Sequence, residues 1–258
     1  MGTDDEIIVG LHAVAEALAA GERLRRIIIG QQRRNDPALK DIVRAAADSQ
    51  ITIEYRSDAQ LRSLGADRYQ HVAAVAPPFG YVAWPDMLRS IQRDGESLVV
   101  AIDHVEDPHN LGAILRNAEA AGAAAAIIPE RRSAMVTPAA RRSAAGAASH
   151  LAVSRVTNLT QALKALKGAG HWIIGASLAG EARPYTEVDL TGSCTIVIGS
   201  EGRGLSRLVA ESCDLLARIP LHGRVASLNA SAAAAVLLFE AVRQRAQRSS
   251  GAAQNKPH

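Results

Sequence analysis

The sequence contains few cysteines and no long apolar run. Cys194 and Cys213 are its only cysteines, too few for a disulfide scaffold or for a zinc site made of four cysteines. Its apolar stretches, such as residues 232–239, are far shorter than the roughly 20 residues that cross a bilayer. The N-terminus reads MGTDDEIIVG, whereas a secretory signal begins with basic residues. We therefore expect a cytoplasmic protein that has no membrane partner.

Aromatic residues are also scarce, at 3% of the 258 residues. This scarcity argues against an RNA-binding sheet of the RRM or OB type, because such sheets hold bases on exposed rings. The formal net charge is only +3, but arginines are adjacent at residues 33–34, 131–132 and 141–142. Adjacent arginines can neutralise phosphates, and they can equally form a solvated helix face. Charge alone leaves both interpretations open.

Short apolar segments alternate with longer segments of helical period along the chain. The predicted strands are residues 7–9, 26–29, 51–55, 71–76, 97–102, 124–128, 151–153, 172–176, 194–198 and 215–219. The predicted helices are residues 11–20, 37–47, 58–64, 111–121, 138–145, 159–167, 205–213 and 231–247. Such alternation predicts an α/β fold with a parallel sheet and helices on both faces.

A proline-rich segment divides these elements into two groups. Residues 77–85 contain three prolines and one glycine, which neither a helix nor a central strand tolerates. The expected organisation is a small domain over residues 1–77, a linker over 78–95, a larger domain over 96–248 and a disordered tail over 249–258. The rings of Phe79, Tyr81 and Trp84 are expected to pin the linker onto a domain rather than to stack on RNA.

The first segment of chemical interest, residues 103–112, reads DHVEDPHNLG. It joins a predicted strand to a predicted helix, the place where open α/β sheets bind ligands. Asn110 is placed to cap the helix, and Arg116 follows nearly two turns into it. The acidic and histidine side chains lack the spacing of metal ligands on a helix, so we expect no metal. From this segment alone, a surface salt bridge is an equally available role for Arg116.

Two further segments also lie between a predicted strand and a predicted helix. Residues 199–205, GSEGRGL, are rich in glycine, which permits close backbone approach to a ligand. They match neither the P-loop nor the dinucleotide-binding spacing. Residues 218–231, RIPLHGRVASLNAS, form a polar loop of a length that usually has a function of its own. Ser227, Asn229 and Ser231 also fit the ordinary role of helix caps.

Taken together, the three segments resemble the motifs of a known enzyme class. In chain order they read DPxNxGxxxRxAxxxG, GxEGxGL and IPxxGxxxSLNxSxAxxxxxxE. This order and spacing resemble the SpoU/TrmH class of the SPOUT superfamily, which consists of RNA ribose 2′-O-methyltransferases. Residues 8–18 and 71–78 resemble the small L30e-like RNA-binding domain of that class. Residues 131–151 most resemble the branch that methylates a guanosine in the P loop of 23S ribosomal RNA.

The resemblance implies a C-terminal α/β SPOUT domain with a deep trefoil knot, and a homodimer that acts on 23S ribosomal RNA rather than on DNA. It implies that S-adenosylmethionine lies in the knot, held largely by backbone groups. The residues expected to contact this cofactor or to shape its pocket are Gly199, Gly202, Ile219, Pro220 and Leu228. The residues expected to serve the transfer itself are Asn110, Arg116, Glu201, Ser227 and Asn229.

The expected reaction is attack of a ribose 2′-hydroxyl on an electrophilic methyl group. The hydroxyl is a poor nucleophile until its proton is removed or strongly polarised. The resemblance places Arg116 at this step, although a guanidinium resists deprotonation because its pKa is above ~12. We therefore expect Arg116 to orient the hydroxyl and to clamp the adjacent phosphate. A neutral Arg116 that acts as the base is the alternative.

In this class the arginine of the first motif is thought to reach the cofactor pocket of the partner subunit. We therefore expect Arg116 and Asn229 to serve one methyl transfer from different chains. The helix over 231–247 has an apolar stripe that includes Ala235, Leu238 and Val242. This stripe is expected to pack between subunits, and burial within one subunit is the alternative.

Three other functions remain open from the sequence. The first is methylation of another rRNA or tRNA nucleotide. The second is a non-catalytic RNA-binding factor, because a fold alone does not prove a function; the presence of Asn110, Arg116 and Glu201 favours the enzyme. The third is a nucleotide-dependent oxidoreductase, which the alternation suggests but which lacks a dinucleotide fingerprint after its first strand.

Overall fold

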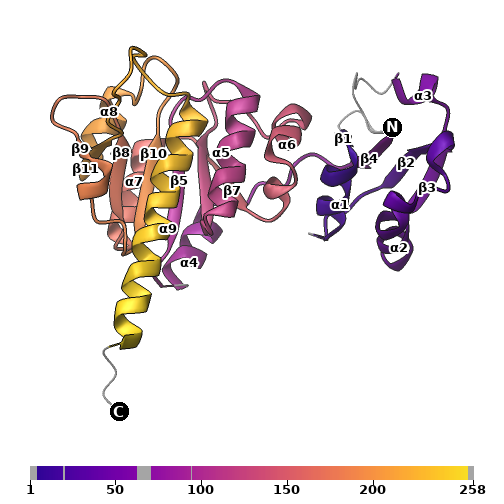
Figure 1. Ribbon diagram of the computed structural model, residues 1–258, viewed down its shortest axis with the longest axis horizontal. Coiled ribbons are helices and arrows are strands. Elements are labelled where there is room, and N and C mark those ends of the chain that lie inside the picture. The colour runs from indigo at the N-terminus through magenta and orange to yellow at the C-terminus, as the bar shows by residue number, and fades with distance from the viewer. Residues whose placement is uncertain (1–4, 20, 63–70, 94, 255–258) are drawn as a thin grey trace.

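The computed structural model describes residues 5–19, 21–62, 71–93 and 95–254, which form two lobes built on separate sheets (Figure 1). The strands of the smaller lobe are β1 (Glu6–Val9), β2 (Arg26–Gly30), β3 (Thr52–Arg56) and β4 (Val72–Ala76). Its helices are α1 (Leu11–Ala19), α2 (Lys40–Asp48) and α3 (Asp58–Arg62), with 3₁₀ turns at Gln31–Arg33 and Pro37–Leu39. The rest of the predicted helix 58–64 lies outside the described residues.

The sheet of the smaller lobe has the strand order β1-β4-β2-β3. Strand β4 runs antiparallel to both β1 and β2, and only β2 and β3 are parallel. The prediction of a parallel sheet is therefore wrong for this lobe. The physical reason is that β4 enters between two earlier strands, and the alternation of apolar segments carries no information on pairing direction.

The larger lobe has seven strands, and all of its strand pairs are parallel, as predicted. The strand order is β7-β6-β5-β10-β8-β11-β9. These strands are β5 (Leu98–Ile102), β6 (Ala125–Pro129), β7 (Ala152–Val156), β8 (Trp172–Ala176), β9 (Arg183–Pro184), β10 (Cys194–Ile198) and β11 (Leu215–Arg218). The helices are α4 (Trp84–Arg93), α5 (Pro108–Ala120), α6 (Pro138–Ala144), α7 (Leu159–Gly168), α8 (Arg207–Glu211) and α9 (Ala230–Gln254), with 3₁₀ turns at Ala147–Ser149 and Tyr185–Glu187.

Helices cover both faces of the larger sheet. Alternate residues of the central strands point to opposite faces, so Val100 belongs to the core under α5 and α9 whereas Val99 belongs to the core under α4 and α7. Burial of each such side chain contributes about 1.5–3 kcal/mol. None of the helices in the described part of the chain combines the length and the apolarity that crossing a bilayer requires.

The segment predicted as a linker, residues 78–95, contains a helix. Helix α4 buries Met87 and Ile91 against the larger sheet, so it belongs to the core of the larger lobe. The proline content was misleading because Pro85 stands in the first turn of α4, where a missing N–H breaks no helical bond. The prediction for the aromatic rings is confirmed for Tyr81, whose hydroxyl accepts a hydrogen bond from Val136 N at 2.9 Å.

Helix α9 extends further than the sequence predicted. It reaches Gln254, past residue 248, where we expected a disordered tail to begin. The Ser249 hydroxyl donates to the Arg245 carbonyl at 3.0 Å, and no proline occurs before residue 257 to end the helix. Residues 255–258 of the predicted tail lie outside the described residues.

The two lobes contact each other through the buried guanidinium of Arg141 in α6. Arg141 lies 3.2 Å from a Glu6 carboxylate oxygen and 3.1 Å from a Glu22 oxygen, both in the smaller lobe. Its guanidinium also stacks over the ring of Phe79, 5.1 Å from the ring centre. The backbone of Gly146 in the larger lobe also lies directly against the Glu16 side chain of the smaller lobe. A Cβ atom on Gly146 would lie only 2.3 Å from Glu16 Cβ. The connection between the lobes is therefore packed rather than free.

We expect Arg141→Ala to separate the lobes, because two largely buried carboxylates would lose their cation. Breaking such an ion pair costs about 3–5 kcal/mol. Urea denaturation should show this loss of unfolding free energy, and small-angle scattering should show a larger radius of gyration. The neighbouring Arg142 is exposed, so Arg142→Ala serves as the matched control. Equal stability and equal scattering of the two variants would contradict the docking role of Arg141.

Candidate active site

The candidate site lies at the carboxyl edge of the parallel sheet. Because all strands of this sheet run in one direction, the loops that follow β5, β8, β10 and β11 leave from the same edge. The backbone N–H of Asp103, after β5, donates to the carbonyl of Ile198 at the end of β10, at 2.7 Å. The three segments singled out in the sequence, together with the loop after β8, therefore meet in one place.

The loop after β10, residues 199–205, is a closed turn. Ser200 and Gly204 exchange two backbone hydrogen bonds, of 3.1 and 2.9 Å. Gly202 and Gly204 have φ angles of +79° and +68°, which favour glycine. A Cβ atom on Gly199 would lie 2.3 Å from the backbone carbon of Gly204, so the turn closes only because residue 199 has no side chain.

Asp103 fixes the end of this loop. Its carboxylate is fully buried, and its Oδ2 accepts a hydrogen bond from Ser206 N at 2.6 Å. No role for Asp103 was predicted from the sequence. The available signal is its position directly after a buried strand, at the edge where ligands bind.

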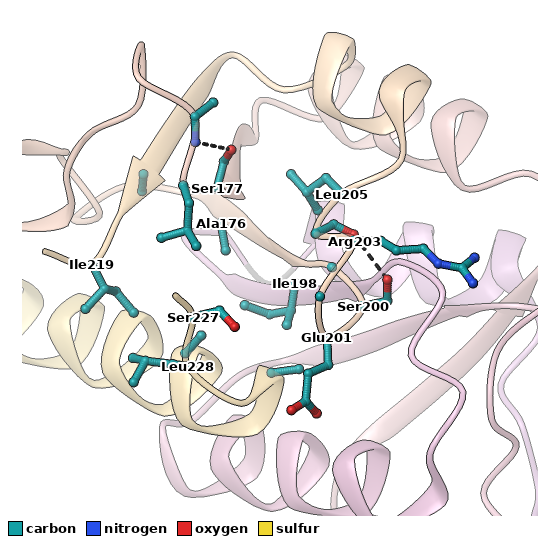
Figure 2. A pocket seen from close by; sticks show the side chains of 18 of the residues that line it. Ala176, Ser177, Ile198, Ser200, Glu201, Arg203, Leu205, Ile219, Ser227 and Leu228 are labelled. Atoms are coloured by element: carbon teal, nitrogen blue, oxygen red, sulfur yellow. Dashed lines mark hydrogen bonds between the residues drawn. The ribbon is translucent and has the colours of Figure 1, made fainter. Parts of the chain in front are cut away.

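A cavity of about 330 Å³ opens between these loops, within the size range of small-molecule sites. Figure 2 shows Ile219 and Leu228 on one side of it and the loop that carries Ser200 and Glu201 on the other. Of the residues predicted for the cofactor, Gly199, Gly202, Ile219 and Leu228 line the cavity. Pro220 is exposed, and it is not among the lining residues.

Three of the five residues predicted to serve the transfer touch one another beside this cavity. The Asn229 amide donates to Asn110 Oδ1 at 2.8 Å and lies 3.4 Å from Glu201 Oε2. The Asn110 amide donates to the same Glu201 oxygen at 3.3 Å. Glu201 itself lines the cavity, so these contacts join all three loops at its border. Ser227 also lines the cavity, on the loop before α9.

The capping role predicted for Asn110 is wrong, because Asp107 caps α5 instead. Its carboxylate accepts hydrogen bonds from His109 N at 3.0 Å and Asn110 N at 3.3 Å. Asp107 can do so because Pro108, which lacks an N–H, takes the first helical position. The Asn110 side chain is thereby left free to bond across to Glu201 and Asn229.

Arg116 does not join this cluster within one chain. Its side chain is exposed on α5, and it is absent from the cavity lining. Six residues along a helix place Arg116 on a different side of α5 from Asn110. Among the described residues the Arg116 side chain has neither a hydrogen bond nor an ion pair, so the surface salt bridge considered from the sequence is not formed.

Two features of the site were missed in the sequence. The loop after β8, including Ser177 and Ala179, forms part of the cavity wall. The predicted end of that strand at residue 176 was correct and could have pointed to this loop. The amide of Asn117 donates to the Ser231 carbonyl at 2.9 Å and so ties α5 to the start of α9.

The cysteines do not provide a nucleophile. Burial raises the pKa of the Cys213 thiol to about 12 and raises that of the Cys194 thiol as well. Both therefore stay protonated at neutral pH. Within the residues that the structure describes, no three His, Cys, Asp or Glu side chains form a group that could hold a metal ion.

Comparison with known proteins decides the family. The model of the SpoU rRNA methylase family matches residues 97–239, and that of the RNA 2′-O ribose methyltransferase substrate-binding domain matches residues 7–82. The chain belongs to the SpoU rRNA methylase family. A Staphylococcus aureus protein that carries the name TrmH family tRNA/rRNA methyltransferase is 40% identical over 243 residues, which cover 94% of this chain and 97% of that protein.

Solved structures of SpoU methyltransferases share the whole fold. AviRb from Streptomyces viridochromogenes is similar with a TM-score of 0.77 and 25% identity, over 95% of this chain and 91% of that chain. An rRNA methyltransferase from Sinorhizobium meliloti, bound to S-adenosylmethionine, has a TM-score of 0.77 and 26% identity, over 93% of this chain and 88% of that chain. The prediction of an S-adenosylmethionine-dependent RNA 2′-O-methyltransferase is confirmed at the level of the family.

The cavity of this SpoU methylase suits that cofactor. Ile219 and Leu228 offer apolar surface to a flat adenine ring. Gly202, which is exposed, leaves backbone uncovered on the facing wall, where polar groups of a ligand can approach it. Among the described residues, Glu201 is the acidic side chain that lines the cavity.

We expect Gly199→Ala to weaken the binding of S-adenosylmethionine, because the added methyl group would force the turn at 200–204 open. Overpacking of this kind costs ~1–3 kcal/mol, which corresponds to a loss of affinity of about 5- to 150-fold. Calorimetric titration measures it. Gly168→Ala is the control, since this glycine lies in α7 outside the cavity lining and a Cβ atom there meets nothing within 4 Å. Unchanged affinity of a folded Gly199→Ala protein would show that the closed turn is not required.

Proposed function

We propose that this SpoU methylase transfers a methyl group to the ribose 2′-oxygen of a guanosine in the P loop of 23S ribosomal RNA. The observation that carries the proposal is the contact of Asn110, Glu201 and Asn229 at the border of the cavity. The likeness of residues 131–151 to the branch with that target supports the choice of RNA. Arg131 and Arg132 of this segment are exposed on the loop after β6, where phosphates can reach them.

When bound, S-adenosylmethionine supplies the electrophilic methyl group. The ribose hydroxyl must then approach in line and lose its proton. The amides of Asn110 and Asn229 can position it through hydrogen bonds, and the Glu201 carboxylate holds both amides in place. Ser227, on the cavity wall, adds a hydroxyl beside them. Gly199, Gly202, Ile219 and Leu228 hold the cofactor, with Pro220 setting the course of the loop. The deep trefoil knot remains a prediction.

We assign Arg116 to the ribose hydroxyl and the adjacent phosphate. A guanidinium is a poor base but a strong hydrogen-bond donor to phosphate oxygens. In this role it orients the hydroxyl while the proton leaves through the phosphate or water. Because Arg116 is exposed and unpaired among the described residues of its own chain, we propose that it acts in the cavity of a second subunit.

If two subunits pack through α9, one residue of the predicted apolar stripe cannot take part in the contact. Leu238 is fully buried within its own chain, so the alternative of internal burial holds for this residue. Ala235 and Val242 are only partly buried, and Phe239 is 47% exposed. These three residues are therefore among the apolar contacts that α9 can offer to a partner.

We expect Arg116→Ala to lower the rate of methyl transfer at least ~100-fold, the usual effect of removing a group that stabilises the transition state. Its affinity for S-adenosylmethionine should stay unchanged, because Arg116 acts on the RNA. Single-turnover kinetics and calorimetry separate the two quantities. A large loss of cofactor affinity in this variant would assign Arg116 to the cofactor instead.

We further expect two inactive variants to restore each other when mixed. If Arg116→Ala and Asn229→Ala chains are unfolded together and refolded, random pairing makes half of the dimers mixed. Each mixed dimer has one doubly altered site and one intact site, so about a quarter of all sites should recover. If differently tagged chains co-purify while activity stays at the mutant level, each site is built within one chain.

The choice of RNA is tested by mapping ribose 2′-O-methyl groups on ribosomal RNA. In a strain lacking the gene, one P-loop guanosine of 23S ribosomal RNA should lose its methyl group, and the wild-type gene should restore it. The gene for Arg116→Ala should not. Loss of a methyl group from a tRNA instead would select the other target that the names of the relatives allow.

A further inference from the structure

A second cavity, of about 390 Å³, shares the loop of residues 200–205 with the cofactor cavity. Asn110 and Glu201 of the polar cluster lie in its lining. A group held there would therefore sit directly beside the atoms assigned to the ribose. Its size is in the range of sites for small flat molecules.

His104 forms a rigid part of this cavity. Its backbone has a φ angle of +55°, an unusual conformation for a residue with a side chain. Its Nδ1 lies 2.5 Å from Oδ1 of the buried Asp103, so the imidazole donates to that carboxylate and is held in one orientation. The side chain is still 37% exposed. A fixed, partly open ring in a cavity is a surface on which a base can stack.

Of the carboxylates that the described part of the chain places in this cavity, Glu106 is the one without a role inside the protein. Asp107 caps α5, and Glu201 holds the two amides. Glu106 is exposed and forms no hydrogen bond or ion pair with any described residue. It is therefore available to accept hydrogen bonds from a ligand.

Two arginines stand at the same cavity. Arg132 and Arg203 are both lining residues, both are exposed, and neither has a partner within the described ranges. Unpaired guanidinium groups beside this cavity are suited to the phosphates on either side of a nucleoside.

We infer that this cavity receives the base of the nucleoside to be methylated, and that Glu106 selects guanine. The inference rests on the proposed function. The guanine edge presents N1–H and the N2 amino group side by side, and a carboxylate accepts both. Cytosine and adenine place an acceptor next to their amino group, which repels a carboxylate, and uracil presents only one N–H between two carbonyls. His104 stacks on the base, while Arg132 and Arg203 hold the flanking phosphates.

The test compares two P-loop RNA hairpins with the full-length protein, one with guanosine and one with inosine at the methylated position. Inosine lacks the N2 amino group but keeps N1–H. We expect the wild-type protein to favour guanosine at least about tenfold in kcat/KM. Glu106→Gln should bring this ratio close to one, largely through slower reaction of the guanosine hairpin. Glu187→Gln, which changes an exposed glutamate outside both cavities, should leave the ratio unchanged.

A second measurement does not depend on the RNA target. Guanosine monophosphate, added to the protein loaded with S-adenosylmethionine, should shift the NMR signal of the His104 ring, and cytidine monophosphate should not. In Glu106→Gln this selectivity should disappear, while affinity for S-adenosylmethionine stays at the wild-type value.

The outcomes separate this inference from the proposed function. If the guanosine hairpin is methylated but Glu106→Gln keeps the full preference, the base site is wrong and the function stands. If the hairpin is not methylated while guanosine monophosphate selectively shifts His104, the target is wrong and the base site stands. If neither nucleotide shifts His104, the inference is overturned.

Discussion

The two backbone hydrogen bonds between Ser200 and Gly204 fold the loop after β10 back onto its own beginning, against the bare backbone of Gly199. Both cavities use this closed turn as a wall. It also sets the position of Glu201, the acidic group that the described residues contribute to the lining of the first cavity. Opening the turn would therefore disturb the cofactor site and the polar cluster together.

The polar cluster depends in turn on the relative placement of α5 and α9. Asp107 caps α5 and leaves the Asn110 side chain free, while Asn117, two turns further along, donates to the backbone at the start of α9. Asn229 stands directly before α9 and accepts a hydrogen bond from Ser231 N at 2.8 Å. The two asparagines of the cluster thus project from helix starts that are tied to each other. Such preorganisation lets hydrogen-bonding groups act without rearranging during the reaction.

The larger sheet could be predicted from the sequence because its strands are buried on both faces. Such strands appear as continuous apolar runs, and the predicted limits of 172–176 and 194–198 agree with β8 and β10. The antiparallel course of β4 could not be predicted, since pairing direction depends on contacts between distant segments. Helix α4 was missed because proline has opposite meanings in the first turn and in the interior of a helix.

For the site, the motifs indicated which loops meet, and the structure adds how they meet. Gly199, Gly202, Ile219 and Leu228 line one cavity as their shared resemblance implied. The sequence predicted Asn110 as the cap of α5, three residues after Asp107, which is the cap in the structure. Aspartate and asparagine have equal capping preferences, so only the fold selects between these two residues. Spacing along a helix does not tell which subunit a side chain serves, so the expectation that Arg116 acts in a partner's cavity came from the resemblance alone; the structure adds that Arg116 lies apart from the cavity of its own chain.

Methyl transfer as proposed requires the loops at 199–205 and 219–230 to form the cofactor site. A crystal structure of the protein with S-adenosylmethionine tests it most directly. We expect the cofactor in the cavity of about 330 Å³, against the backbone of Gly199, Ile219 and Leu228, with its methyl group toward the side of Glu201. A cofactor bound elsewhere, such as in the cavity between the lobes beside Glu22 and Phe79, would contradict it.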